Sequence, residues 1–394
     1  MPGGWHKNRY TEFQVASSPV TQRTPQELAP KAAPSARRVW PRILAIIVFF
    51  AAYEGILFHT GIYSSIIEPV STTGSMELQL RNEIRRPKPD RNQVLAVGHS
   101  RMALRPRVAN GLQPATGYTF ATIALGGTTP RVWYYDLRAV DPDAHNYAAI
   151  IIPTDDYNEP DSFEDPADRE SDVHYLLARL ELRDLSDFPW TYHARRRQWE
   201  MARDILLKGA VYNRDFLDFV PHPFARIEKA RFYAAGSAGW YYDYRGNDTS
   251  LAGLQIDWRH RTIQFPDRIP PDLRKAIQVV VFPDMPPDQG RETAYLRYWY
   301  GRIVDYYRHS NTKLIFLRVP RAPTSPPDPA LKLNSAVRQI ASEPNVIVLD
   351  ERLFNQLEHP GLFEDGMHLN SNGMEQFSKI LANEVRRVLG PPKS

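Results

Sequence analysis

The amino-acid sequence predicts an α/β fold with a parallel sheet between helices, a three-layer α/β/α sandwich. Two observations carry this prediction. Apolar runs that are too short for core helices alternate with helical patterns, and the first of these runs ends in a Gly-x-Ser turn. Such runs suit parallel strands, which are buried on both faces. The expected strands are 94–97, 118–125, 146–152, 276–282, 312–317 and 345–349, with a helix at 132–139.

The composition is that of an ordinary globular chain. Of its 394 residues, 42% are hydrophobic, which is enough for a packed core. The net charge is +4 with basic and acidic residues interspersed, and there is no zinc-finger spacing, so we expect no nucleic-acid partner. Cysteine is absent, which excludes disulfides and thiolate metal sites. The histidines show no metal-ligand spacing, and we expect neither a metal nor a cofactor.

The chain divides into segments of different character. Residues 1–38 are rich in Pro, Ser, Ala, Thr and Gln, which predicts a disordered tail. Residues 39–63 are mostly apolar and have about the twenty residues that a membrane helix needs, so we expect a transmembrane anchor; the alternative is a buried helix of a soluble domain. Residues 64–91 would link it to a domain at 92–394, with a helical, aromatic-rich insertion at about 160–271.

The basic residues around the apolar segment predict its orientation. Lys31, Arg37, Arg38 and Arg42 precede it or lie at its start. By the positive-inside rule, the N-terminus is then cytoplasmic and the domain is extracytoplasmic, either periplasmic or at the cell surface. Glu54 interrupts the segment and is expected near the membrane interface or in its protonated form.

Ser100 is the residue around which the candidate site is built. The strand 94–97 precedes it, and Gly98 permits a sharp turn that places Ser100 at the carboxyl end of this strand. Open α/β sheets carry their chemistry at that edge. Since a Gly-x-Ser turn alone is a weak signal, its meaning depends on a base elsewhere in the chain.

The C-terminal part of the chain supplies this base. Asp365 and His368 lie three residues apart, just before an amphipathic helix that Asn370 or Ser371 can cap. A serine hydroxyl becomes a good nucleophile when an imidazole takes its proton, and the imidazole needs a carboxylate that fixes its tautomer and stabilises its cation. His368 and Asp365 could do these two jobs for Ser100.

A serine turn after the first strand and an Asp-x-x-His block near the C-terminus resemble the SGNH (GDSL-like) hydrolase superfamily. Gly98-His99-Ser100 stands where the family has Gly-Asp-Ser, so His99 is a departure that leaves the nucleophile in register. The resemblance implies a catalytic triad of Ser100, His368 and Asp365. It covers the first strand and turn, two middle blocks and the C-terminal block, and it leaves the middle of the chain uncovered.

The resemblance also implies where the oxyanion is held. In the second family block a glycine N–H is a donor, and Gly127 aligns best, with Gly126 as the second choice. In the third block, Asp155 replaces the usual Asn donor. An ionised carboxylate cannot donate a hydrogen bond, and losing one oxyanion donor costs about 100- to 1000-fold in rate. Three alternatives follow for an active enzyme. Asp155 is protonated, or its side chain points elsewhere, or Thr154 or Asn158 donates to the oxyanion in its place.

Two further features bear on the substrate. Arg318 follows a strand at the edge that faces the predicted site, so we expect it to contact the substrate. The aromatic residues of the insertion suit sugar rings; the alternative is that they fill the core of the insertion.

The resemblance and the predicted anchor together imply a serine acyl-esterase or O-acyltransferase, with acetyl as the expected acyl group. Its substrate would be an acylated polysaccharide of the cell envelope, and a membrane-bound partner would supply the acyl group. The alternative is a catalytically weak protein of the same fold that binds polysaccharide or assists its assembly, which Asp155 in the oxyanion block favours.

Overall fold

The computed structural model describes residues 36–88, 92–154, 166–236, 250–282, 291–323 and 335–392. The chain divides into two compact units, Met1–Ala51 and Ala52–Ser394, and the sheet and the candidate site belong to the second. Of the tail expected at 1–38, residues 1–35 lie outside the described residues, and a helix begins at Ala36.

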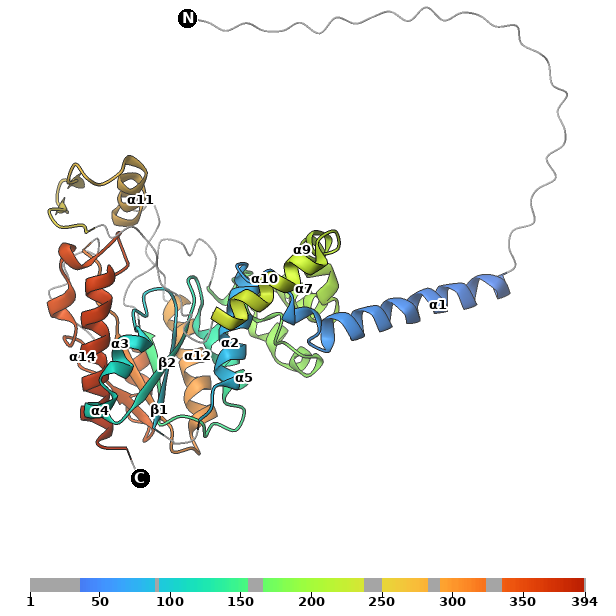
Figure 1. Cartoon of the computed structure of the whole chain (residues 1–394), viewed down its shortest axis with the longest axis horizontal. Helices are drawn as coiled ribbons and strands as arrows, with labels where there is room; N and C mark the ends of the chain where they lie inside the picture. Colours follow the sequence, from blue (N-terminus) through green and yellow to red (C-terminus); the bar gives the residue numbers. More distant parts are fainter. Residues whose placement is uncertain are drawn as a thin grey trace, which may run out of the picture. The chain divides into compact units, whose positions relative to one another are not determined.

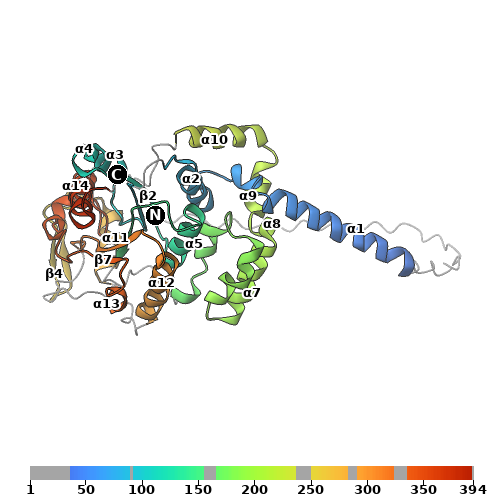
Figure 2. The ribbon, with the colours of Figure 1, turned by 90° about the horizontal axis from the view of Figure 1, so that it is seen from below.

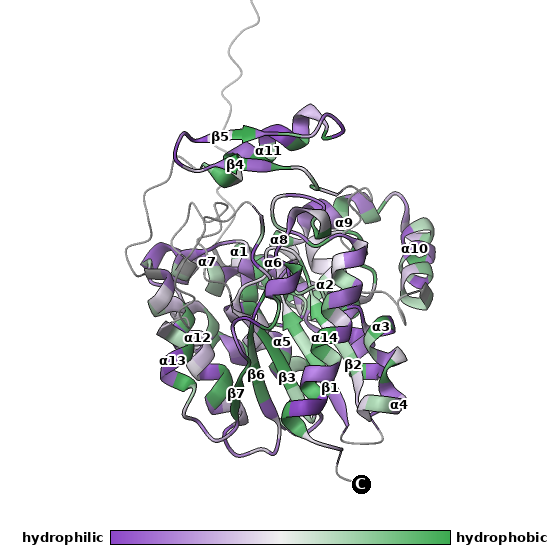
Figure 3. Ribbon diagram, turned by 90° about the vertical axis from the view of Figure 1, so that its left-hand side faces the viewer, coloured by the Kyte–Doolittle hydropathy of each residue, from purple (hydrophilic) through white to green (hydrophobic). Residues whose placement is uncertain are grey.

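A five-stranded parallel sheet forms the centre of the second unit, with the strand order β2-β1-β3-β6-β7 (Figure 3). Its strands are β1 (Gln93–Gly98), β2 (Thr119–Ala124), β3 (Ala149–Thr154), β6 (Lys313–Arg318) and β7 (Val346–Val348). The expectation of an α/β fold with a parallel sheet is thus confirmed. Because β2 and β3 flank β1 on opposite sides, the winding of the chain reverses at β1. Open α/β sheets place their ligand sites at such a switch point.

Helices connect the strands and continue into the insertion. Around the sheet they are α2 (Thr72–Arg85), α3 (Pro106–Gly111), α4 (Gln113–Thr116), α5 (Pro130–Val140), α12 (Arg291–Tyr307), α13 (Ser335–Ile340) and α14 (Ser371–Leu389). Between β3 and β6 lie α6 (Asp172–Leu176), α7 (Arg195–Leu206), α8 (Lys208–Val211), α9 (Asn213–Phe219), α10 (Pro223–Gly236), the β4–β5 hairpin (Gln255–Asp257 and Thr262–Gln264) and α11 (Pro271–Val281). Short 3-10 helices lie at Tyr63–Ser65, Pro166–Asp168, Leu182–Ser186, Phe188–Thr191, Asn355–Leu357 and Pro360–Leu362.

Both faces of the sheet are buried. Along β1, Leu95 and Val97 belong to one hydrophobic cluster, and Val94 and Ala96 belong to a second, as the alternation of side chains along a strand requires. The first cluster includes side chains of α2, α5, α12 and α13, and the second includes side chains of α3, α11 and α14. Figures 1 and 2 accordingly show α3 and α14 on one side of the sheet and α2 and α5 on the other. The strands themselves are predominantly hydrophobic (Figure 3).

The anchor expected at 39–63 falls in an apolar helical segment. The helix α1 (Ala36–Glu54) continues into a π-helix at Gly55–His59. Among the described residues, Val39–Ser65 is the one segment that is long and apolar enough to be a candidate membrane span. Glu54, which interrupts this segment, is buried, and its Oε1 accepts a hydrogen bond from the Gly209 N–H at 2.9 Å.

The segment expected as a linker, 64–91, contains α2 and is packed into the domain. Met76 and Leu80 of α2 lie in the first hydrophobic cluster. Glu77 pairs with Arg179 of the insertion, at 2.6 Å between Oε2 and Nε. Most of this segment is therefore part of the folded unit.

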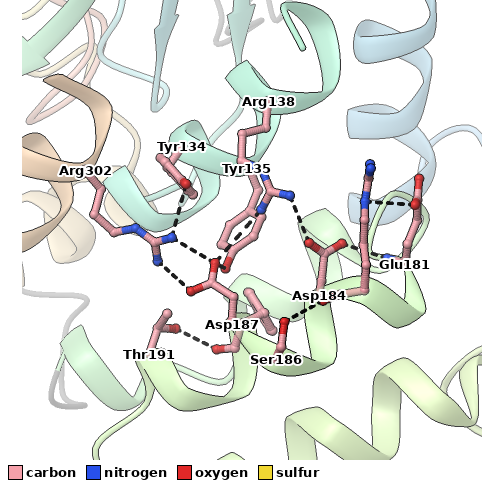
Figure 4. A network of polar contacts seen from close by, with 11 residues as sticks. Tyr134, Tyr135, Arg138, Glu181, Asp184, Ser186, Asp187, Thr191 and Arg302 are labelled. Carbon is pink, nitrogen blue, oxygen red and sulfur yellow. Dashed lines mark hydrogen bonds and ion pairs between the residues drawn. The ribbon is translucent and has the colours of Figure 1, made fainter. Parts of the chain in front are cut away.

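A polar network joins the insertion to the helices that cover the sheet (Figure 4). Arg302 on α12 donates to Asp187 at 2.8 Å, and Tyr135 on α5 donates to the same carboxylate at 2.7 Å. Arg138 on α5 donates to Asp184 at 3.1 Å. Burial alone would raise the pKa of Asp187, but the hydrogen bonds from Arg302 and Tyr135 lower it. The insertion is thus held to the sheet domain by charged contacts as well as by apolar packing.

The prediction of a strand at 276–282 is wrong, because 276–281 belong to the helix α11 and Phe282 is its C-cap. Pro271 occupies the first turn of α11 together with Asp272, and both residues favour a helix start. Ile277 and Val281 are buried four residues apart, whereas Val279 between them is 58% exposed. The pattern therefore has the period of a helix and a sidedness that a fully buried strand would lack.

Candidate active site

Strand β1 delivers Ser100 to the carboxyl edge of the sheet, at the switch point. The Met102 N–H donates to the His99 carbonyl at 3.0 Å, so Ser100 lies inside a tight turn directly after the strand. Gly98 permits the close packing before this turn, since a Cβ at this position would lie 2.8 Å from Pro153 Cγ on β3 and 3.0 Å from Met102 Cβ. A larger residue would therefore push β1 and β3 apart just before the nucleophile.

The structure brings Ser100, His368 and Asp365 together, although Ser100 and His368 are 268 residues apart in the chain. The Nε2 atom of His368 lies 2.8 Å from Ser100 Oγ. Its Nδ1 atom lies 2.9 Å from Asp365 Oδ2. With Nδ1–H donating to the carboxylate, Nε2 is the atom that can accept the serine proton. The geometry is that of a nucleophile, a base and a carboxylate that orients the base.

The loop that carries Asp365 and His368 is closed by its own backbone. The Glu364 N–H donates to the His368 carbonyl at 2.9 Å. The Oδ1 atom of Asp365 accepts from the N–H groups of Met367 and His368 at 2.8 and 2.7 Å. Burial alone would raise the pKa of Asp365, but the hydrogen bond and charge of His368 and the two N–H groups lower it to about 2. The carboxylate is therefore ionised at neutral pH.

Helix α14 anchors this loop to the domain. Asn370 is the N-cap of α14, and its side-chain oxygen accepts a hydrogen bond from the Gly373 N–H at 3.0 Å. Asn370 is one of the two residues that the sequence predicted as the cap. Met374 and Phe377 are buried in the second hydrophobic cluster. The Asn370 N–H also donates to the Leu362 carbonyl at 2.8 Å, which fixes the start of the helix to the end of the 3-10 helix Pro360–Leu362.

The two glycines expected near the oxyanion form the loop after β2. Gly127 has a φ of +76°, and a Cβ at this position would lie 2.7 Å from the hydroxyl of Tyr175. The Tyr175 hydroxyl donates to the Gly126 carbonyl at 2.7 Å. The Thr128 hydroxyl donates to the Gly98 carbonyl at 2.8 Å. The loop is thus held from one side by the insertion and from the other by the strand end that carries the nucleophile.

The third expected block is described only in part. Thr154 ends β3, and its hydroxyl donates to the Leu317 carbonyl at 3.0 Å. Asp155 and Asn158 lie outside the described residues. Of the donors that the sequence offered in this block, Thr154 is therefore the one whose contact is known, and that contact is to the neighbouring strand.

Arg318 lies at the carboxyl end of β6, where the sequence placed it, and its guanidinium is occupied by protein groups. Nε donates to the Glu351 carbonyl at 2.7 Å, and Nη2 donates to Asn355 Oδ1 at 2.9 Å. Nη1 lies 2.6 Å from Glu358 Oε1, and the side chain is 3% exposed. These contacts hold the segment after β7 against β6.

His99, the residue before Ser100, packs against α5. Its ring lies 5.9 Å from that of Trp133 on α5, and its Nδ1 accepts the Arg101 N–H at 3.1 Å. The Trp133 Nε1–H donates to the Thr128 hydroxyl at 3.0 Å. His99 therefore connects the nucleophile turn to the same helix that supports the glycine loop.

Sequence reasoning missed two residues of the insertion that lie at the glycine loop. Tyr175 donates to the Gly126 carbonyl, and the guanidinium of Arg169 would lie 3.7 Å from a Cβ at Gly127. The available signal was the tyrosine itself, since a buried Tyr hydroxyl needs a hydrogen-bond partner. The sequence does not say which carbonyl that partner is.

Among the residues that the structure describes, no group of three or more His, Asp or Glu side chains is placed to hold a metal ion. The chain's sequence matches no protein-family model and no curated protein. The arrangement of Ser100, His368 and Asp365 is accordingly the ground on which a function can be assigned.

Proposed function

We propose that the protein is a membrane-anchored serine acyl-esterase or O-acyltransferase, with a three-layer α/β/α fold like that of SGNH hydrolases. The observation that carries this proposal is the chain of contacts from Ser100 Oγ to His368 Nε2, at 2.8 Å, and from His368 Nδ1 to Asp365, at 2.9 Å. A serine paired with an oriented imidazole at the carboxyl edge of a parallel sheet is suited to acyl transfer.

In the proposed reaction, His368 Nε2 takes the hydroxyl proton of Ser100 while Oγ attacks the carbonyl carbon of an ester. Negative charge develops on the carbonyl oxygen, and the backbone N–H groups of Ser100 and Gly127 are the proposed donors to it. The bond to the leaving oxygen then breaks, His368 returns the proton to that oxygen, and the acyl group remains on Ser100. Water or a sugar hydroxyl removes the acyl group, with His368 again as the base.

Asp365 supports both halves of this reaction. Its hydrogen bond fixes the imidazole of His368 with Nε2 toward Ser100, and its negative charge stabilises the imidazolium that forms when the proton is taken. Because its pKa is lowered to about 2, the carboxylate is ionised throughout the neutral range.

We propose a cell-envelope polysaccharide as the substrate. The candidate span Val39–Ser65 and the basic residues before it favour a cytoplasmic N-terminus and a domain on the other side of the membrane. Trp190 and Trp199, on contacting elements of the insertion, are 62% and 74% exposed. Flat aromatic faces of this kind suit sugar rings. Where the reaction is a transfer, a membrane-bound partner supplies the acyl group.

The same exposed tryptophans favour a second candidate, a membrane-tethered polysaccharide-binding protein with little or no catalysis. In that case Trp190 and Trp199 would carry the function, and the contact between Ser100 and His368 would be a structural one.

The test is covalent labelling of the full chain in detergent with a fluorophosphonate, together with hydrolysis of a short-chain acyl ester. We expect labelling of the wild type and of Ser186→Ala, an exposed serine away from the site, but not of Ser100→Ala. We expect both Ser100→Ala and His368→Ala to lose about 10⁴-fold or more in hydrolysis. If the wild type is not labelled and polysaccharide binding persists in Ser100→Ala, the esterase proposal is wrong and the polysaccharide-binding protein takes its place.

A further inference from the structure

An apolar surface that no described element covers lies on α9 and α10. Its residues, called here the α9–α10 face, are Leu217, Val220, Phe224 and Phe232, and their exposed fractions are 62, 54, 85 and 72%. The first three follow one another at intervals of three and four residues across the turn between the helices. Single exposed apolar residues are common on soluble domains, but a gathering of large ones marks a surface that binds something.

One charged side chain of α10, that of Arg226, is turned inward. Arg226 is 5% exposed; it pairs with Asp215 at 2.8 Å and with Glu68 at 3.2 Å, and it also contacts Asp218. Phe224, two residues earlier, is 85% exposed. In contact with water the usual partition is the reverse, with arginine outside and phenylalanine inside. The outer side of α10 around Phe224 is therefore suited to surroundings less polar than water.

Helices α8 and α9 pack on the C-terminal part of the candidate membrane span. Within the second unit, Glu54 accepts the N–H of Gly209 on α8 at 2.9 Å, and the ring of Phe58 lies 5.9 Å from that of Phe216 on α9. Glu54 and Phe58 belong to the C-terminal part of Val39–Ser65. If this segment crosses a bilayer, elements that contact its last turns lie at the level of the lipid headgroups.

We propose that the α9–α10 face lies in the interfacial region of the bilayer, beside the spanning segment, and binds lipid directly. Leu and Phe side chains insert their apolar surface between the headgroups and the acyl chains, as they do in other interfacial helices. Arg214 and Arg231 are exposed on the same helices and can reach lipid phosphates. A bilayer fits this surface better than a protein partner because α9 contacts Phe58, a residue of the candidate span. The proposal rests on the candidate span and is independent of the esterase reaction.

The absence of cysteine from the chain permits a direct test. Single variants Leu217→Cys, Phe224→Cys, Ile47→Cys and Val279→Cys are made in the full chain, spin-labelled, and reconstituted into nanodiscs of phosphatidylcholine and phosphatidylglycerol. Ile47 lies in α1 and reports on the span. Val279 is a matched control, since it is an exposed apolar residue on α11, which Figures 1 and 2 place apart from α9 and α10. Accessibility to oxygen, which concentrates in lipid, is compared with accessibility to a water-soluble nickel complex.

We expect oxygen to relax the labels at 217, 224 and 47 more than nickel does, and the reverse at 279. Labels at 217 and 224 that respond as the label at 279 does, with 47 in lipid, would overturn the proposal while leaving the span intact. Low accessibility to both reagents at 217 and 224 would also overturn it, in favour of a protein that covers the face. A nickel-accessible label at 47 would show that the candidate span does not lie in the bilayer, and it would overturn the proposal as well.

Discussion

Replacing Asp365 by Asn tests the part of the site on which the activation of Ser100 depends. The substitution keeps the shape of the side chain, and its oxygen can still accept the Met367 N–H, but it removes the charge that faces His368 Nδ1. The imidazole is then free to take the wrong tautomer, and its cation loses its partner. We expect ester hydrolysis to fall about 10⁴-fold, the loss produced by the same substitution in a serine protease triad.

The same substitution should change stability in a way that depends on pH. The pKa of Asp365 is lowered from its ordinary value of 3.8 to about 2, because the hydrogen bonds from His368 and the two N–H groups outweigh burial. At about 1.4 kcal/mol per pKa unit, this corresponds to about 2 kcal/mol of stability. Because the folded pKa is the lower one, this stability is present above about pH 4 and is lost as the pH falls toward 2.

The measurements are ester hydrolysis and urea unfolding of the full chain in detergent, the latter from about pH 7 to about pH 3. Asp350→Asn is the matched control, since Asp350 is exposed and accepts the Arg352 N–H at 2.8 Å in a similar turn without a histidine. It should leave hydrolysis unchanged and stability within about 0.5 kcal/mol. The reasoning is refuted if Asp365→Asn keeps more than about a tenth of the activity. It also fails if the stability difference is the same at every pH.

Two further predictions concern the supports of the site. Gly127→Ala should destabilise the protein by about 1–3 kcal/mol in thermal unfolding and reduce hydrolysis, because the φ of +76° and the Tyr175 hydroxyl 2.7 Å away both oppose a Cβ. Gly111→Ala, whose Cβ meets nothing within 4 Å, is the control, and full activity in Gly127→Ala would remove this loop from the proposed oxyanion site. Arg131→Met should lower the free energy of unfolding by about 3–5 kcal/mol. In the wild type the fully buried Asp172 carboxylate lies 3.0 Å from Arg131 Nη1, and the variant leaves this carboxylate without its cation. Adding Asp172→Leu should recover part of this loss, and an equal or greater loss in the double variant would contradict the argument.

The parallel sheet and the triad were accessible from the sequence for a common reason. Buried parallel strands are apolar on both faces, so each of the five strands left a short, mostly apolar run that marks it. The triad residues follow such runs or precede a strongly amphipathic helix, so their places in the fold are fixed by local signals. The N-cap Asn370 was also predictable from a local signal, since its capping contact to Gly373 lies within one helical turn.

What the sequence could not supply are contacts between distant segments. A run such as 276–282 is compatible with a strand or a helix until the burial of each face is known, and only then does α11 become evident. Arg318 was placed correctly on its strand edge, but its partner Glu358 comes from a segment forty residues later in the chain. Tyr175 reaches the glycine loop from the insertion, which has no sequence signal that ties it to the site.

The separation of Ser100 from His368 has a consequence for the order of events in biosynthesis. The chain is made from its N-terminus, so the serine turn exists long before the residue that would take its proton. The 267 residues between them must fold around the sheet before α14 can dock and bring His368 Nε2 to 2.8 Å from Ser100 Oγ. A nascent or truncated chain thus carries an unactivated hydroxyl. Under the proposed reaction, reactivity of Ser100 would report that α14 has docked.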